Sequence, residues 1–247
     1  MGLRYRLRTL AARVGHELEV RRRRVPVPAE RRPLSLPENL IALDSAEGTQ
    51  LLREAGAIAD YVPLSIHFVT QDTPTFCGPA SMSMVLNALG IERPGTRISG
   101  EHGLFDQENV FTRETHHITP RAEIARHGTP LSTLGRFFEA HGVDVSTVYA
   151  SAVTPDAFRE EAQRILQTPG EYLVVNYNRS KVGQRTGGHI SPVAAYNAAA
   201  DRFLVLDVSR YKYPPFWVRA EELYGAMNVK TGAGITHGYV TVRNKAA

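Results

Sequence analysis

The sequence predicts an α+β fold in which helices come first and antiparallel strands follow. Two observations support this prediction. Between residues 45 and 167, apolar side chains recur at spacings of three and four behind helix-capping residues. After residue 170, the segments are short, rich in β-branched and aromatic residues, and bounded by glycine, asparagine and aspartate. Helices and strands are therefore expected in separate halves of the folded region.

Four helices are predicted in the first half. Ser45 is suited to cap the first of them. The segment GPASMSMVLNALG at 78–90 predicts the second, because proline favours the first turn of a helix and glycine favours its end. Two more helices are predicted within 130–142 and 154–167. Residues 91–118 are less regular and are expected to form loops and short helices.

The second half predicts four strands and one short helix. The polar segment NAAADR joins the second strand to the third, so these two are expected to form an antiparallel hairpin. The strands are predicted at 171–178, 189–197, 202–209 and 237–244, and the helix at 220–228.

Length, composition and charge restrict the class of protein. The chain has 247 residues, of which 43% are hydrophobic and 22% charged, enough to bury a core without disulfides. One cysteine cannot form an internal disulfide, and no apolar run is long enough to predict a membrane-spanning helix. The formal net charge is +4, but residues 1–32 alone carry +7, which leaves −3 for the other 215 residues. Because the body is mildly acidic, nucleic-acid binding is not expected.

Residues 1–35 are predicted to be a basic, proline-rich extension and linker that precedes a folded domain at 36–247. The segment 1–24 has an apolar stripe at helical spacing, with arginines mostly off the stripe. This pattern fits a helix lying on an anionic membrane surface, but a solvated, poorly ordered extension is the favoured interpretation, because chain ends fray by default. Residues 25–37 contain four prolines and predict an extended linker.

The only cysteine lies in QDTPTFCGPAS, at the N-terminal end of the second predicted helix. The positive end of a helix dipole favours a thiolate, which is the nucleophilic form of cysteine. A lone cysteine is more often a small buried apolar residue, so catalysis also requires a histidine base and donors for an oxyanion. Gln71, on the loop before Cys77, is placed to supply a side-chain amide beside the backbone N–H of Cys77.

His189 is the best candidate base among the nine histidines. It follows two glycines at the start of a predicted strand, where a substrate can approach the backbone closely. Asp207 is the one carboxylate in the apolar segment FLVLDVS, and a buried charge needs a partner. In the predicted hairpin the two side chains are expected to be cross-strand neighbours. The alternative for Asp207 is a structural cap for the loop that follows.

Four segments resemble the catalytic domain of phytochelatin synthases, most closely the short prokaryotic members of that family. They are LPENLIALDSAEGTQLL, SIHFVTQDTPTFCGPASMSMVLNALGI, NYNRSKVGQRTGGHISPVAAYN and RFLVLDVSRYKYPPFWV. The resemblance extends from about Leu36 to Arg243, which is nearly the whole predicted domain.

The resemblance implies a papain-like cysteine protease fold, a triad of Cys77, His189 and Asp207, and Gln71 in the oxyanion hole. The implied substrate is glutathione. Cys77 would attack the carbonyl that joins the substrate's cysteine to its glycine, and glycine would leave. The γ-glutamylcysteinyl thioester would then pass to water, giving γ-glutamylcysteine, or to a second glutathione, giving phytochelatin. No cofactor is required, and a cadmium or zinc ion would enter as part of a metal–glutathione thiolate substrate.

Three features differ from the plant-like pattern of this family. The sequence has no cysteine-rich C-terminal region and no cysteine besides Cys77, so tight thiolate binding of a metal by the protein is not expected. His237 stands where relatives carry arginine, and an imidazole cannot copy the two-pronged grip of a guanidinium on a carboxylate. All three features favour water over a second glutathione as acceptor.

The candidate substrate-binding residues flank His189 or lie on neighbouring basic loops. The basic members fit an ordinary solvated loop equally well. They are Asn176, Gly187, Gly188, Arg179, Lys181 and Arg210.

The expected partner is glutathione, and the oligomeric state stays open, a homodimer included. Cytoplasmic residence is inferred from the reduced thiol substrate and from the absence of a secretory signal pattern. Two other functions are open. A general papain-like cysteine peptidase would cleave ordinary α-peptides, whereas a non-catalytic thiol-peptide or metal-binding protein would keep its full effect after Cys77→Ser.

Overall fold

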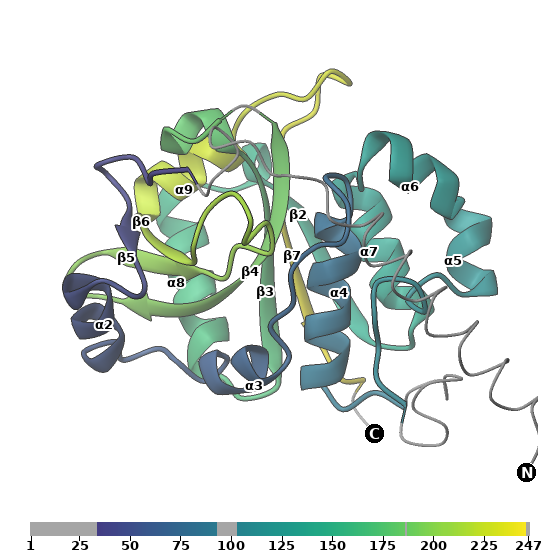
Figure 1. Ribbon diagram of the computed structural model, residues 1–247, viewed down its shortest axis with the longest axis horizontal. Helices are drawn as coiled ribbons and strands as arrows, with labels where there is room; N and C mark the ends of the chain where they lie inside the picture. Colours follow the sequence, from purple (N-terminus) through teal and green to yellow (C-terminus); the bar gives the residue numbers. More distant parts are fainter. Residues whose placement is uncertain (1–33, 93–102, 186, 246–247) are drawn as a thin grey trace, which may run out of the picture. The chain divides into compact units, whose positions relative to one another are not determined.

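The computed structural model of the protein describes residues 34–92, 103–185 and 187–245 (Figure 1). Ser35–Ala247 form one compact unit. The amphipathic segment and most of the linker predicted in the N-terminal extension lie outside the described residues. Among the described helices, none combines the length and hydropathy that crossing a bilayer requires.

The described residues contain one seven-stranded sheet with the order β1-β6-β5-β4-β3-β7-β2, and every neighbouring pair is antiparallel. The central pair, β3 and β4, runs in register from Leu173 opposite Val193 to Asn178 opposite Gly188. The strands are β1 (Ile41–Ala42), β2 (Asp144–Tyr149), β3 (Glu171–Asn178), β4 (Gly188–Asn197), β5 (Arg202–Val205), β6 (Phe216–Arg219) and β7 (Gly238–Arg243).

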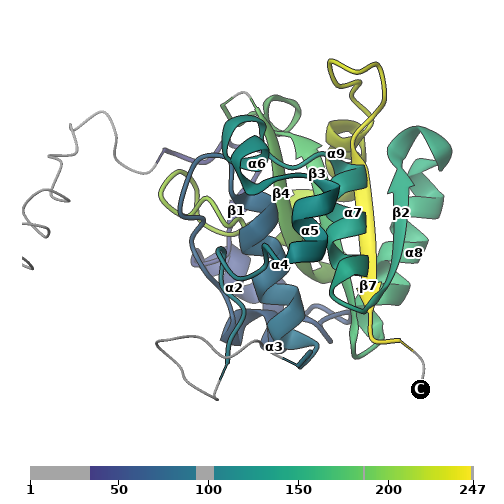
Figure 2. The same ribbon diagram turned by 90° about the vertical axis from the view of Figure 1, so that its right-hand side faces the viewer.

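Helices cover both faces of this sheet (Figures 1 and 2). On one face α4 packs on β4, and α7 packs on β2 and β7; on the other face α8 and α9 pack on β3. A separate hydrophobic core lies on each face of the sheet. Successive side chains of β3 point into the two cores alternately: Val174 packs in the core that contains α4, and Val175 in the core that contains α8 and α9. The helices are α2 (Ala46–Arg53), α3 (Tyr61–Ile66), α4 (Cys77–Ala88), α5 (Arg113–Ile118), α6 (Arg121–His127), α7 (Leu131–Ala140), α8 (Pro155–Gln167) and α9 (Ala220–Met227), with short 3₁₀ turns η2 (Ala150–Ala152) and η3 (Arg179–Val182).

Helix α4 is the central helix of the hydrophobic core that lies between α4, α7 and the sheet. Its side chains are buried on every face from Cys77 to Asn87, which explains why its apolar stripe is so broad in the sequence. Gly90 follows it with φ +67°, a left-handed conformation that glycine adopts without strain. The Ser81 hydroxyl donates to the carbonyls of Cys77 (2.8 Å) and Ile190 (3.4 Å), so it ties the first turns of α4 to β4.

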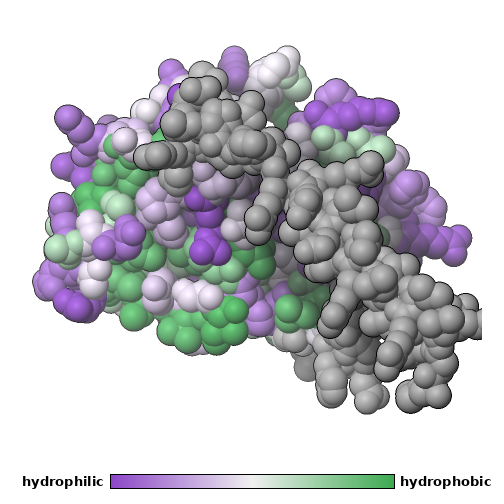
Figure 3. All heavy atoms as spheres, in the orientation of Figure 1, coloured by the Kyte–Doolittle hydropathy of each residue, from purple (hydrophilic) through white to green (hydrophobic). Residues whose placement is uncertain are grey.

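Apolar side chains also gather on the surface over α3 (Figure 3). Leu64 is fully buried, whereas Val62 and Ile66 are 61% and 72% exposed. The helix therefore presents one apolar side to the core and a second one to the surface.

The predicted α+β class is confirmed, and so are most of its elements. Helices occur at every position predicted for one, and the β4–β5 hairpin forms across residues 198–201. The third predicted strand is shorter than expected, because only Arg202–Val205 pair and residues 206–209 leave the ladder. The structure adds three strands that were not predicted, β1, β2 and β6. β1 and β6 have only two and four residues, and β2 lies at the edge of the sheet, where one open side weakens the burial pattern.

Candidate active site

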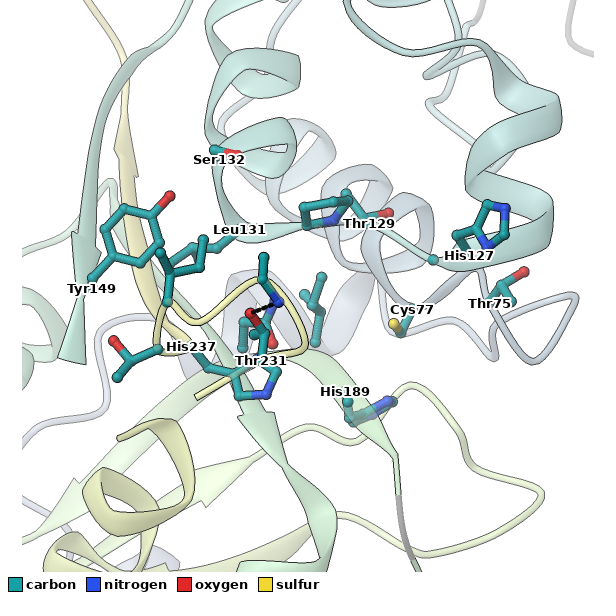
Figure 4. Close-up of a pocket in the computed structure, with 18 of the residues that line it drawn as sticks. Thr75, Cys77, His127, Thr129, Leu131, Ser132, Tyr149, His189, Thr231 and His237 are labelled. Carbon is teal, nitrogen blue, oxygen red and sulfur yellow. Dashed lines mark hydrogen bonds between the residues drawn. The ribbon is translucent and has the colours of Figure 1, made fainter. Parts of the chain in front are cut away.

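A cavity of about 410 Å³ lies beside the N-terminus of α4 (Figure 4). Its walls come from the loop before α4, the α6–α7 connection, the ends of β2, β3 and β4, and the segment before β7. Cys77 and His189 both line it, from α4 and β4 respectively. Figure 4 shows these two side chains near one end of the cavity and Tyr149 at the other. The fold thus brings together two residues that are 112 positions apart in the sequence.

The environment of Cys77 favours the neutral thiol. Burial raises the pKa of Cys77, and this effect outweighs the backbone N–H groups of Ile190 and Gly78 and the charge of Arg179, which lower it. The thiolate predicted from the helix N-terminus alone is therefore not the resting state, because the side chain is only 7% exposed. Cys77 needs a base that removes its proton when substrate binds.

His189 is held from behind by two buried groups. Its Nε2 lies 2.8 Å from Asp207 Oδ1 and 2.9 Å from Ser191 Oγ. Nε2 carries the proton in this arrangement, since it faces a carboxylate. The other ring nitrogen, Nδ1, makes no hydrogen bond within the described part of the chain, so its lone pair is free to accept a proton. Burial lowers the pKa of His189, although Asp207 opposes this effect, and the ring is neutral and able to act as a base.

Asp207 lies two residues beyond β5, where the chain stays beside β4, since Leu206 N donates to Pro192 O (3.0 Å). Arg179, in η3, donates from Nη2 to Asp207 Oδ1 (2.8 Å), and its Nη1 lies 2.8 Å from Oδ2 in an ion pair without hydrogen-bond geometry. Burial alone would raise the pKa of Asp207, but His189 and Arg179 hold it well below its usual range. Asp207 is therefore ionised at neutral pH.

The position of Arg179 differs from the prediction that it binds substrate. It was expected to grip a substrate carboxylate, but its guanidinium is buried against Asp207, stacks 5.3 Å from the Tyr213 ring and hydrogen-bonds Gln184. A group with these partners is not free for substrate. The sequence could not reveal this, because a basic residue in a loop looks the same whether it is solvated or paired with a buried acid.

Gln71 is buried, and both hydrogens of its amide are engaged. Nε2 donates to Thr73 O (2.7 Å) and to the Tyr211 hydroxyl (3.0 Å), while its backbone N–H donates to Val208 O (2.8 Å). Gln71 is not among the described residues that line the cavity. Its role in an oxyanion hole stays a prediction.

The remaining predicted substrate residues divide into two groups. Asn176 and Gly188 line the cavity, whereas the lining contributed by the described residues does not include Gly187, Lys181 or Arg210. The guanidinium of Arg210 instead stacks 4.8 Å from the ring of Phe68. A substrate role for these three stays a prediction.

His237 also lines the cavity, and burial lowers its pKa. It packs near Gly188, whose added Cβ would lie 3.6 Å from His237 Cε1. Within the described ranges there is no group of three or more histidine, cysteine, aspartate or glutamate side chains able to hold a metal ion.

Comparison with known proteins identifies the family of this chain. A family model described as phytochelatin synthase matches residues 31–239. The chain is 34% identical to glutathione gamma-glutamylcysteinyltransferase 1 of Lotus japonicus, over 80% of this chain and 39% of the relative. It is 32% identical to glutathione gamma-glutamylcysteinyltransferase 1 of Arabidopsis thaliana, over 86% of this chain and 43% of the relative.

A more distant relative extends the comparison beyond plants. The chain is 28% identical to glutathione gamma-glutamylcysteinyltransferase of Schizosaccharomyces pombe, over 83% of this chain and 49% of the relative. In each case it spans less than half the length of the curated relative. The family match covers most of the chain, including both sides of the cavity, and the chain belongs to the phytochelatin synthase family.

Proposed function

We propose that this protein removes glycine from glutathione through a γ-glutamylcysteinyl thioester on Cys77. The observation that carries the proposal is the arrangement of Cys77 and His189 on one cavity, with Asp207 fixing the far side of the imidazole. The names of the relatives supply the substrate.

The first half-reaction forms the thioester. His189 Nδ1 takes the proton from the Cys77 thiol, and the sulfur attacks the carbonyl carbon of the cysteinyl–glycine amide. The backbone N–H of Cys77, at the start of α4, faces the oxyanion that develops. When this intermediate collapses, the C–N bond breaks and the glycine amine takes the proton from His189. For Gln71 to add a second donor, its Nε2–H must leave the Tyr211 hydroxyl for the oxyanion.

The second half-reaction releases the acyl group. His189 takes a proton from water, or from the α-amine of a second glutathione, as that nucleophile attacks the thioester. The Cys77 sulfur leaves as a thiolate and regains its proton from His189. Water yields γ-glutamylcysteine, and glutathione yields phytochelatin. A cadmium or zinc ion takes part only as metal bound to the glutathione thiolate.

The catalytic domain is proposed to be residues 36–247 in a papain-like arrangement. A cysteine at the start of a buried helix facing a histidine on an antiparallel sheet supports this assignment. Cytoplasmic residence is proposed because the substrate is a thiol that must stay reduced.

Mass spectrometry of glutathione incubated with the protein, with and without Cd²⁺, tests the proposal. Glycine with γ-glutamylcysteine indicates hydrolysis, and longer γ-glutamylcysteine oligomers indicate transfer. Cys77→Ala and His189→Ala are each expected to abolish glycine release. Asp207→Asn is expected to reduce it by roughly a thousandfold or more, because the imidazole loses its orienting anion. Glycine release that survives in Cys77→Ala would falsify the mechanism, and cleavage of ordinary α-peptides would favour a general peptidase.

A further inference from the structure

Thr129, in the connection between α6 and α7, has a hydroxyl with no hydrogen-bond partner in the described part of the chain. The residue is 7% exposed, and its Oγ1 makes no hydrogen bond to any other described residue. It also lines the cavity that contains Cys77. A buried hydroxyl without a partner is destabilising, so such a group in a binding cavity points to a contact with a ligand.

The hydroxyl lies directly over the first turn of α4. A Cβ added to Gly78 would lie 2.4 Å from Thr129 Oγ1 and 2.8 Å from Thr129 Cβ, so only glycine fits beneath it. Gly78 is the residue after Cys77. The Thr129 hydroxyl therefore contacts the chain directly beside the nucleophile. Figure 4 shows Thr129 on the cavity wall between Cys77 and Leu131.

On the Thr129 side of Cys77 the cavity extends as far as Tyr149. In Figure 4 the wall continues from Thr129 through Leu131 and Ser132 to Tyr149. The acyl part of glutathione, γ-glutamylcysteine, is larger than the glycine that leaves, so it fits this side. Within that acyl part, the nitrogen of the γ-amide is two bonds from the carbonyl carbon that Cys77 attacks. The γ-amide therefore lies next to Cys77, as the Thr129 hydroxyl does.

We propose that Thr129 is a substrate-binding residue whose hydroxyl accepts a hydrogen bond from the γ-amide N–H of the acyl donor. This inference rests on the proposed function and adds a residue that recognises the γ-glutamyl linkage by a hydrogen bond. Thr129 contributes affinity for the acyl group and fixes its carbonyl over Cys77, while proton transfer stays with His189.

Thr129→Val removes the hydroxyl and keeps the shape, and Thr129→Ser keeps the hydroxyl. For Thr129→Val, kcat/KM for glycine release should fall about tenfold or more, because the substrate amide loses its partner in a buried site. Its Tm without ligand should be equal or higher, because an unpaired buried hydroxyl has been removed. Thr129→Ser should retain most of the activity. A hydroxyl with only a structural role would instead lower Tm and leave kcat/KM intact.

Direct binding separates this inference from the proposed function. In a Cys77→Ala background, calorimetry should show that Thr129→Val weakens glutathione and γ-glutamylcysteine by the same factor, since both contain the γ-amide. Unchanged affinity for both, or a loss for glutathione alone, overturns the role of Thr129 while leaving the function standing. If the wild-type protein releases no glycine and Cys77→Ala binds neither compound, the proposed function itself fails.

Thr115→Val is the matched control. The Thr115 hydroxyl is also buried, but it accepts from Thr112 N (2.8 Å) and donates to Thr112 O (3.1 Å). This substitution should lower Tm and leave kcat/KM unchanged, the opposite of the result expected at Thr129.

Discussion

Asp60, the residue before α3, is predicted to lower the stability of the protein at neutral pH. Its side chain is fully buried, and neither carboxylate oxygen has a hydrogen-bond partner among the described residues. Burial, and then the charge of Glu171, raises the pKa of Asp60 to about 8. The folded protein therefore keeps this carboxyl protonated at pH 7, whereas the unfolded chain releases the proton at about pH 4.

The size of the effect follows from this difference. Because the pKa is higher in the folded state, the stability that Asp60 contributes is fully present below about pH 4 and is lost as the pH rises to about 8. Each pH unit inside that window costs at most about 1.4 kcal/mol. At pH 7 the free energy of unfolding is therefore lower by roughly 2–4 kcal/mol than it would be with a group that does not ionise.

Asp60→Asn removes the ionisation and nearly keeps the shape. The amide inherits the lack of partners, so the informative quantity is how the stability difference from wild type changes with pH. Between pH 5 and pH 7 the variant should gain about 3 kcal/mol relative to wild type. For a chain of this size, that gain corresponds to roughly 6–10 °C in Tm.

Urea unfolding of both proteins at pH 5, 6, 7 and 8 measures this change. Asp156→Asn is the control, because its carboxylate is 80% exposed and pairs with Arg159 at the surface, so it should lose at most about 1 kcal/mol. If the difference between wild type and Asp60→Asn is the same at pH 5 and pH 7, Asp60 is solvated or ionised in the folded protein and the reasoning fails.

Two further predictions concern the site. Arg179→Gln should destabilise the protein by about 3 kcal/mol and move the acid limb of the kcat/KM–pH profile to higher pH, because the charge of Arg179 lowers the pKa of His189. Arg179→Lys keeps the charge and should leave that limb in place; equal shifts in both variants would exclude the electrostatic explanation. His237→Arg should lower KM for glutathione and flatten its pH dependence, since burial lowers the pKa of His237 and leaves the wild-type ring neutral at pH 7. If His237→Arg and the wild-type protein have the same KM at every pH between 5.5 and 8, no substrate carboxylate approaches this residue.

Local sequence signals predicted the parts of the fold that depend on backbone preference. Pro79 and Gly90 marked the two ends of α4 to within about two residues, and the short polar link between β4 and β5 marked their hairpin. His189 and Asp207 could be paired in advance because a hairpin brings its two strands together whatever surrounds it. β2 was missed because its partner, β7, is distant in sequence and its residues are at most partly buried, and β1 and β6 were missed because two and four residues are too short to show an alternating pattern.

The sequence by itself determined where Cys77 begins a helix and which histidine and carboxylate share a hairpin, since these follow from chemistry within a few residues or one turn. Only the tertiary structure decided that Arg179 pairs with Asp207, that Gln71 bonds the Tyr211 hydroxyl, and that the Thr129 hydroxyl has no partner among the described residues. Those outcomes depend on which distant segments pack together. Packing sets the burial of each polar side chain and the partners within its reach, and neither quantity is encoded in the neighbouring residues of the chain.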